Sequence, residues 1–184
     1  MDNGASSYRR FLDGDDTGMT EIVRDYKDGL MLYLNSYINN LSIAEECVQN
    51  TFIKLAIKKP AFRGESSFKT WLYKISRNIA VSHIRKVSRH RKALLDECEN
   101  LVAETDLENE YLKEEQKIMV HRAIRRLKKE YQQVLYLTYF EDFSNAETAV
   151  IMRKSRKQVE NLLYNARKAM RSELEKEEFH YEEL

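Results

Sequence analysis

The sequence predicts an all-α protein made of two small helical domains joined by an acidic linker. With one proline and five glycines among 184 residues, the chain has few helix breakers. Its apolar residues recur at helical spacing, without the sustained alternation typical of strands. Its charge, only +1 overall, is sorted into two basic blocks separated by an acidic one. We expect domains at residues 18–92 and 117–174, the linker at 93–116, an N-terminal tail at 1–17 and an acidic C-terminal tail at 175–184.

The first domain is expected to begin with two amphipathic helices. Tyrosine, leucine and isoleucine residues at helical spacing predict one long helix over residues 18–39. A capping box formed by Ser42 and Glu45 predicts the start of a second helix, because each side chain can satisfy a backbone N–H of the first turn. That helix should end before Pro60.

A third helix, capped by Ser67, is predicted to have one packing face and one cationic face. The apolar stripe consists of Phe68, Leu72, Ile75 and Ile79. The cationic stripe consists of Thr70, Lys74, Arg77, Asn78, Val81 and Arg85. Trp71 lies on the border between the two faces, and positive charge is expected to continue past the helix end to Lys92.

The second domain is expected to contain a helix-turn-helix. Helices are predicted over residues 118–129 and 131–141. Ser144 and Glu147 form a capping box that opens a short helix, and Ser155 and Gln158 repeat that pattern to open a last helix. About three residues separate these last two helices, which is the geometry of a helix-turn-helix.

The last helix carries side chains suited to duplex DNA on the face opposite its packing stripe. Val159, Leu163, Ala166 and Met170 fall on that stripe and are expected to be buried. Arginine, asparagine and glutamate can pair with base edges, whereas lysine and tyrosine suit phosphates. A generic helical hairpin remains an alternative, but it gives no reason for basic residues in the first turn. The duplex-DNA candidates are Ser155, Arg156, Lys157, Glu160, Asn161, Tyr164, Arg167 and Lys168.

The basic block of the first domain suits single-stranded DNA. From residue 53 to residue 92 there are twelve Lys and Arg against one acid, so phosphates can follow this face. Unstacked bases can lodge against nearby aromatic rings, each stacking contact contributing about 1–3 kcal/mol. Phe68 is expected to be a core residue, and Trp71 could serve either role.

Motifs in both halves resemble bacterial sigma factors of the extracytoplasmic-function (ECF) group. Residues 44–53, 62–78 and 84–85 are similar to region 2 of that family, and residues 127–135, 144–149 and 159–167 are similar to region 4. Arg153 stands where the family commonly has a turn glycine. The resemblance implies a transcription initiation factor that binds core RNA polymerase and promoter DNA, and an anti-sigma factor is a further partner that it admits.

The resemblance also implies roles for particular residues. Region 4 would read the −35 element as duplex, through the candidates on the last helix. Region 2 would open the −10 element and trap a flipped base, through Phe62, Arg63, Ser66, Ser67, Trp71, Lys74, Arg77, Asn78 and Arg85. Residues implied to dock on the polymerase are Glu46, Gln49 and Asn50.

Other classes of function are less well supported by the sequence. A helix-turn-helix regulator that is not a sigma factor leaves the basic block of the first domain unexplained, as does a helical scaffold. An enzyme is not expected, and neither is a metal or cofactor, because the four histidines are scattered and form no ligand spacing. Cys47 and Cys98 are expected to be reduced thiols. Without an apolar run of about 20 residues or a signal peptide, we expect a cytoplasmic protein that does not insert into the membrane.

Overall fold

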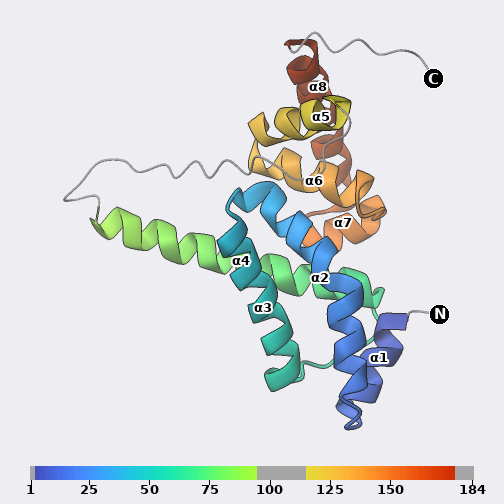
Figure 1. The fold of residues 1–184 in the computed structure, drawn as a ribbon. Coiled ribbons are helices and arrows are strands. Elements are labelled where there is room, and N and C mark those ends of the chain that lie inside the picture. The colour runs from blue at the N-terminus through green and yellow to red at the C-terminus, as the bar shows by residue number, and fades with distance from the viewer. Residues whose placement is uncertain (1–2, 95–114, 177–184) are drawn as a thin grey trace.

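The computed structural model describes residues 3–94 and 115–176, and all regular elements in these two ranges are α-helices (Figure 1). The predicted all-α class is therefore confirmed. The helices are α1 (Asn3–Leu12), α2 (Thr17–Ile38), α3 (Leu41–Lys58), α4 (Phe68–Leu94), α5 (Glu115–Arg126), α6 (Lys129–Tyr139), α7 (Asn145–Met152) and α8 (Arg156–Lys176). No described helix has the length and apolarity needed to cross a membrane.

The predicted N-terminal tail is wrong for most of its length, because residues Asn3–Leu12 form α1. Tyr8 and Phe11 are buried on α2 and its neighbours. Gly18 lets the two helices approach closely, since a Cβ there would lie 2.2 Å from the carbonyl oxygen of Ser7. The sequence reading missed this helix because the segment is short and mostly polar, although the two large side chains that it buries, Tyr8 and Phe11, lie three residues apart on one face.

The long helix α2 and the end of α3 agree with the prediction, but the predicted cap of α3 is wrong. The side chain of Asn40 caps this helix by accepting a 3.0 Å hydrogen bond from the backbone N–H of Ile43. Asn40 has an extended backbone just before the first turn, so Ser42 falls inside that turn and is exposed.

The third helix, α4, is longer than the sequence predicts, and α7 covers part of the face that was expected to be exposed. Ser67 caps it as expected, accepting from the backbone N–H of Thr70 at 3.2 Å. The helix continues to Leu94, so the basic segment after Arg85 extends the helix rather than following it. Thr70, assigned to the cationic face, is fully buried because α7 packs over it.

The two capping boxes of the second domain are confirmed. Ser144 accepts from the backbone N–H of Glu147, whose carboxylate accepts from the backbone N–H of Ser144. Ser155 and Gln158 repeat this arrangement at the start of α8. Arg153 ends α7 in the left-handed conformation with φ 55°. The helix-turn-helix therefore forms as the spacing predicts.

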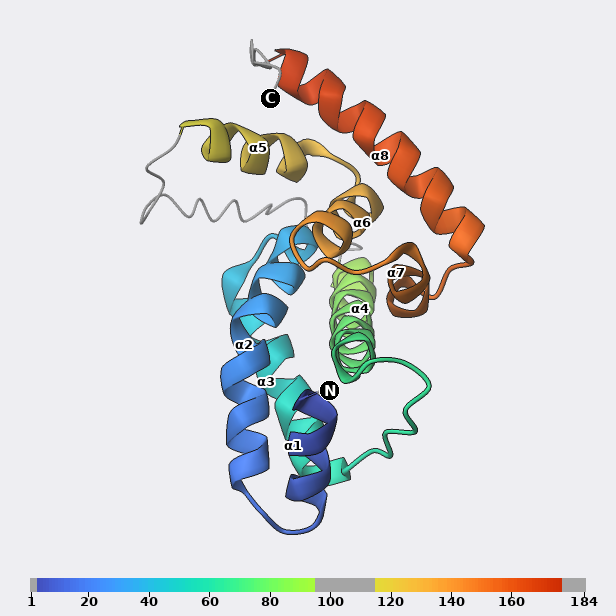
Figure 2. The same cartoon turned by 90° about the vertical axis from the view of Figure 1, so that its right-hand side faces the viewer.

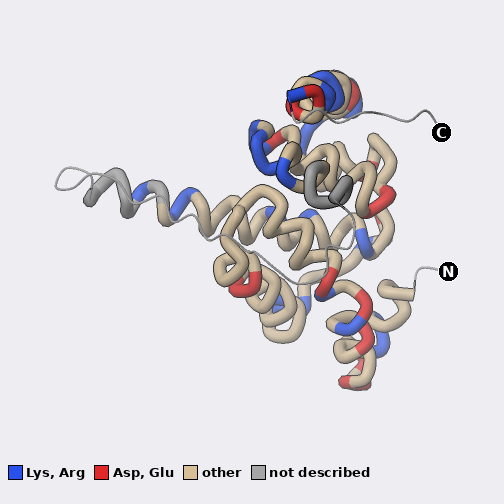
Figure 3. The backbone as a smooth tube through the Cα atoms, turned by 45° about the horizontal axis from the view of Figure 1, so that its top comes forward, with Lys and Arg blue, Asp and Glu red and all other residues tan. Residues whose placement is uncertain are grey.

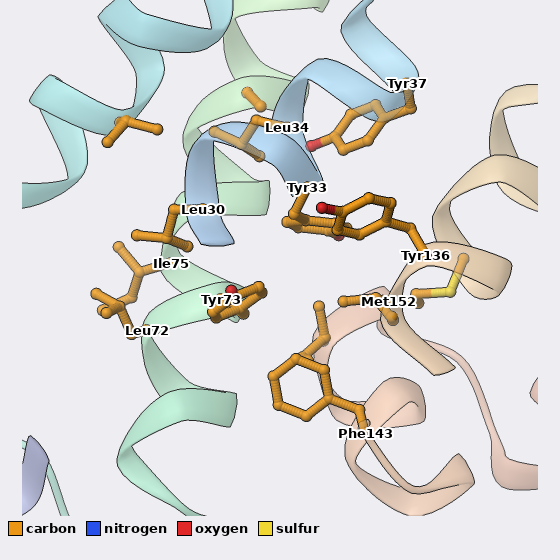
Figure 4. Packing of buried hydrophobic residues seen from close by; sticks show 14 of the residues in the cluster. Leu30, Tyr33, Leu34, Tyr37, Leu72, Tyr73, Ile75, Tyr136, Phe143 and Met152 are labelled. Carbon is orange, nitrogen blue, oxygen red and sulfur yellow. The ribbon is translucent and has the colours of Figure 1, made fainter. Parts of the chain in front are cut away.

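The two domains are packed against each other rather than held apart. Helices α6 and α7 lie against α2 and α4 (Figure 2). At their junction Tyr33 of α2 and Tyr73 of α4 meet Tyr136 of α6 and Phe143, which precedes α7 (Figure 4). We call this packing the closed arrangement. Most of the predicted linker and most of the predicted C-terminal tail lie outside the described residues.

Candidate nucleic-acid interface

A pocket of about 310 Å³ lies between the loop that follows α3 and the first turns of α4. We call it the loop pocket. Gly64, at φ 74°, takes a left-handed conformation that turns the loop there. The pocket is lined by Ala61, Phe62, Arg63, Gly64, Glu65, Ser66, Trp71, Lys74 and Val150. The structure thus brings five of the predicted −10 residues together, and Val150 joins them from the second domain.

The floor of the loop pocket is an aromatic cluster that α1 completes. The ring centroids of Phe62 and Trp71 lie 5.3 Å apart, and those of Tyr8 and Trp71 lie 5.4 Å apart. The Tyr8 hydroxyl donates a 2.8 Å hydrogen bond to the carbonyl oxygen of Pro60, and burial raises its pKa to about 12. Phe68 is fully buried beneath the cluster, as expected.

Trp71 and Phe62 are half-buried, so each contributes to both packing and the pocket. One part of each ring contacts the buried cluster, and both residues line the loop pocket. The two roles that the sequence left open for Trp71 are therefore compatible. Sequence reasoning missed Tyr8, because it lies in a segment that was expected to be a tail.

The remaining −10 candidates do not line the pocket. Ser67 is exposed at the start of α4, Asn78 is half-buried farther along it, and Arg85 is exposed. The Nε of Arg77 donates a 3.0 Å hydrogen bond to the side-chain oxygen of Gln133 on α6. Arg77 and Ser67 therefore face the second domain in the closed arrangement.

Glu141, between α6 and α7, is held by two residues of α4. Its carboxylate lies 2.9 Å from the Nζ of Lys69 and accepts a 2.7 Å hydrogen bond from the hydroxyl of Tyr73. The Glu141 side chain is only 10% exposed. Burial, followed by the charge of Glu141 and this hydrogen bond, raises the pKa of Tyr73 well above its ordinary value, so the hydroxyl remains a donor.

Glu147 links the cap of α7 to the cap of α4. Besides its bonds to Ser144, its carboxylate accepts from the hydroxyl of Thr70 at 3.1 Å and from that of Ser67 at 3.4 Å. Partial burial raises the pKa of Glu147, but these hydrogen bonds outweigh it and lower the pKa below the ordinary value. No sequence pattern pairs residues about 80 positions apart, so these contacts were not predicted.

Helix α8 exposes the residues predicted to contact duplex DNA. Val159, Leu163 and Ala166 are buried as predicted, whereas Met170 is only half-buried. All eight duplex-DNA candidates are exposed. Figure 3 shows Lys and Arg along α8 and along the projecting end of α4. Within the first turns, the Nε of Arg156 lies 3.0 Å from the carboxylate of Glu160.

Tyr139 orients one of the α8 cations. The Nε of Arg167 donates a 2.5 Å hydrogen bond to the hydroxyl of Tyr139, and its guanidinium lies 5.6 Å from the centre of that ring. Tyr164, on α8 itself, is 70% exposed. The exposed face of α8 thus offers Arg167, oriented by Tyr139, and the exposed ring of Tyr164 beside its polar side chains.

The polymerase-docking candidates lie on α3. Glu46 and Gln49 are exposed, whereas Asn50 is half-buried. Ile53 and Ile57 are 51% and 70% exposed on the same helix. At helical spacing these two isoleucines continue the stripe begun by Glu46 and Gln49. They were not among the predicted docking residues, and they leave apolar area exposed beside the polar candidates.

Two family profiles match the two halves of the chain. The profile described as "Sigma-70 region 2" matches residues 22–90, and "Sigma-70, region 4" matches residues 117–170. Together they cover most of α2 to α4 and most of α5 to α8.

Curated relatives match the chain over most of its length. "RNA polymerase sigma factor YlaC" of Bacillus subtilis is 28% identical over 158 residues, covering 85% of this chain and 91% of that protein. "ECF RNA polymerase sigma-E factor" of Haemophilus influenzae is 28% identical over 175 residues, covering 90% of this chain and 92% of that protein.

Solved structures share the fold. The sigma factor RpoE in complex with the anti-sigma factor NepR from Bartonella quintana has a TM-score of 0.69 at 22% identity, over 85% of this chain and 96% of that chain. CnrH in complex with the cytosolic domain of CnrY has a TM-score of 0.63 at 18% identity, over 94% of this chain and 95% of that chain. With both regions matched in order, the chain belongs to the ECF group of the sigma-70 family and is a transcription initiation factor.

Proposed function

We propose that this chain binds core RNA polymerase and divides promoter recognition between α8 and the loop pocket. In this division α8 reads the −35 element as duplex, and the first domain opens and reads the −10 element as a single strand. The observation that carries the proposal is that one chain holds both an exposed polar recognition helix and an aromatic pocket beside a cationic helix face.

Helix α8 would enter the major groove with its first turns. Arg156 can donate two hydrogen bonds to a guanine edge and Asn161 can pair with adenine. Lys157, Lys168 and Arg167 would contact phosphates and fix the position of the helix on the duplex. In the free protein Arg156 is paired with Glu160, so Glu160 is positioned to orient the guanidinium or to accept from a cytosine.

The loop pocket would hold one extruded base. Phe62 and Trp71 supply aromatic surface at its floor, while Arg63 and Lys74 supply positive charge for the flanking phosphates. Extruding a base costs a few kcal/mol, which stacking and phosphate contacts can offset. Asn78 and Arg85 lie farther along α4 and would contact the strand beyond the pocket.

The exposed face of α3 would dock on the polymerase. Glu46 and Gln49 supply polar contacts, and Ile53 and Ile57 supply apolar area next to them. The chain itself would supply binding and positioning rather than a catalytic step, and it would act in the cytoplasm, where RNA polymerase works. An anti-sigma factor is a proposed further partner, because two structurally similar sigma factors were solved with one.

The proposed function is tested by transcription from a library of genomic DNA fragments. Purified core polymerase with this chain should initiate at a limited set of shared sequences, mapped from the 5′ ends of the transcripts, whereas core enzyme alone should not. If no initiation occurs while the chain alone binds duplex DNA tightly, the chain does not act as a sigma factor.

A further inference from the structure

We propose that Tyr8 and Phe11 of α1 are positioning residues for −10 recognition, because they hold the start of the loop that lines the loop pocket. The inference rests on the proposed function, which assigns this pocket to an extruded base. Both side chains are buried, so they would act through the loop rather than by touching DNA. Helix α1 lies before residue 22, where the match to region 2 begins, so it would support promoter reading from outside the matched segment.

The loop leaves α3 through Lys59 and Pro60, which we call the loop stem. Lys59 ends α3 in a left-handed conformation with φ 40°, and Pro60, the one proline of the chain, restricts the next φ angle. The stem lies beside α1, and the chain runs from there to α4 (Figure 2). The stem therefore decides the direction in which the loop sets out toward the pocket.

Two contacts hold the loop stem on α1. The hydroxyl of Tyr8 donates a 2.8 Å hydrogen bond to the carbonyl oxygen of Pro60. The Nζ of Lys59 lies 4.9 Å from the centre of the Phe11 ring, within the range of a cation–π contact. Among the described residues, Tyr8 is the one side chain that forms a hydrogen bond with the backbone of residues 60–65. The position of the stem thus depends on α1.

Beyond the stem, the loop is packed at Phe62 and open at its tip. The ring centroid of Phe62 lies 5.6 Å from that of Phe68 and 5.3 Å from that of Trp71. Residues 63–65 are exposed. A shift of the stem would move Phe62 relative to Trp71 and would change the shape of the loop pocket, since both rings line it.

A pocket wall that is ordered before DNA arrives binds a base more tightly than a wall that must be ordered on binding. If the stem were loose, a fraction of the molecules would hold the pocket in its binding-competent form, and the apparent affinity would fall with that fraction. The contacts of Tyr8 and Phe11 would therefore set both the affinity for the −10 strand and the discrimination between bases in the pocket.

Two conservative variants loosen the loop stem, and a third is their control. Tyr8→Phe keeps the ring that packs against Trp71 and removes the hydroxyl that binds the stem. Phe11→Leu keeps an apolar side chain and removes the ring beneath Lys59. Tyr37→Phe is the matched control, because Tyr37 is also buried, its hydroxyl has no partner among the described residues, and it does not line the loop pocket.

The first measurement uses the fluorescence of Trp71, the one tryptophan of the chain. In the free full chain, Tyr8→Phe and Phe11→Leu should shift the emission to longer wavelength and raise the acrylamide quenching constant, because a loosened loop lets water and quencher reach the ring. Tyr37→Phe should match the wild type. Unchanged emission and quenching in Tyr8→Phe would overturn the inference.

The second measurement uses the chain bound to core polymerase. The probes are single-stranded oligonucleotides that carry a −10 sequence mapped in the transcription test, with each base substituted in turn. Tyr8→Phe should weaken binding of the preferred strand about threefold to tenfold, as expected for the loss of one hydrogen bond, and should narrow the difference between preferred and substituted bases. Duplex binding at −35 should be unchanged. An equal loss at −35, or a base preference like that of the wild type, would overturn the inference.

The two measurements separate this inference from the proposed function. If the Trp71 signal changes as expected while the wild type with core polymerase initiates at no promoter, the support of the loop by α1 stands and the proposed sigma activity fails. If the wild type initiates and Tyr8→Phe retains wild-type fluorescence and base preference, the proposed function stands and the inference fails.

Discussion

The hydroxyl of Tyr73 on α4 donates its hydrogen bond to the carboxylate of Glu141, which belongs to the second domain, at 2.7 Å. A few ångströms away in the same junction, Tyr33 is equally buried but its hydroxyl is unpartnered. The two tyrosines therefore form a natural comparison between a satisfied and an unsatisfied hydroxyl.

Tyr73→Phe should destabilise the protein, and Tyr33→Phe should not. The first substitution removes a hydrogen bond to a charged group, for which a loss of about 1.5–3 kcal/mol in the free energy of unfolding is typical. The second removes a polar atom without a partner, so stability should be unchanged or slightly higher. Urea denaturation of both variants measures the difference, and an equal loss in both would contradict the hydrogen-bond assignment.

Arg153→Gly should stabilise the turn of the helix-turn-helix. Arg153 has φ 55°, a left-handed conformation that costs a residue with a Cβ roughly 1 kcal/mol more than glycine. The midpoint of thermal unfolding should therefore rise for Arg153→Gly. Arg153→Ala is the control, since it removes the same side chain but keeps the Cβ, and a similar gain from alanine would show that strain is not the cause.

Arg156→Ala or Asn161→Ala should relax the preference for the −35 sequence by about 1–3 kcal/mol if the residue contacts a base edge. The measurement is duplex binding by the holoenzyme across a set of single-base substitutions in the −35 element. Lys157→Ala serves as the comparison, because a phosphate contact should weaken all sequences to the same extent. If the Arg156 or Asn161 substitution weakens binding equally for all sequences, that residue contacts the DNA backbone rather than a base.

Asn78→Ala should impair promoter opening while sparing −35 binding. Asn78 is half-buried on α4, beyond the loop pocket and far along the chain from α8. Permanganate reactivity of thymines in the −10 region should fall, and duplex binding at −35 should be retained. A parallel loss of both would contradict the division of labour between the two domains.

Acid should weaken the contribution of Glu147 to the stability of the folded protein. The folded protein lowers the pKa of this carboxyl below its ordinary value of 4.5, so the charged form is favoured by folding. Its contribution is complete above pH 4.5 and is lost as the pH falls through the lower, folded value. The difference in melting temperature between the wild type and Glu147→Gln should therefore be largest near pH 6 and disappear at strongly acidic pH. A difference that persists unchanged in acid would rule out the charge as its source.

Local features of this fold could be predicted from the sequence, and contacts between its halves could not. The capping residues Ser67, Ser144 and Ser155 lie within three positions of the groups that they bind, and the spacing of Val159 and Leu163 identifies the packed face of α8. Such short-range rules fixed the helix-turn-helix and the all-α class. They failed at the start of α3, where Ser42 was predicted to be the cap but the extended backbone lies at Asn40, whose side chain caps the helix instead.

Most residues of the candidate site could be predicted, but the distant segments that pack around them could not. Phe62, Trp71 and Lys74 could be recognised because they lie close together in sequence. Val150 lines the same pocket from more than 70 residues away, and Tyr8 packs against Trp71 beneath it from more than 50 residues away. No periodicity links either residue to the pocket. The burial of Thr70 has the same cause, because the helix that covers it comes from the other domain.

Val150 has a consequence for small molecules. Since one wall of the loop pocket comes from α7, a compound selected to fill the whole pocket would touch both halves of the chain at once and would bind the packed form better than the separated one. Such a compound would hold the two halves of the chain together and, on the proposed function, would compete with the −10 base for the pocket.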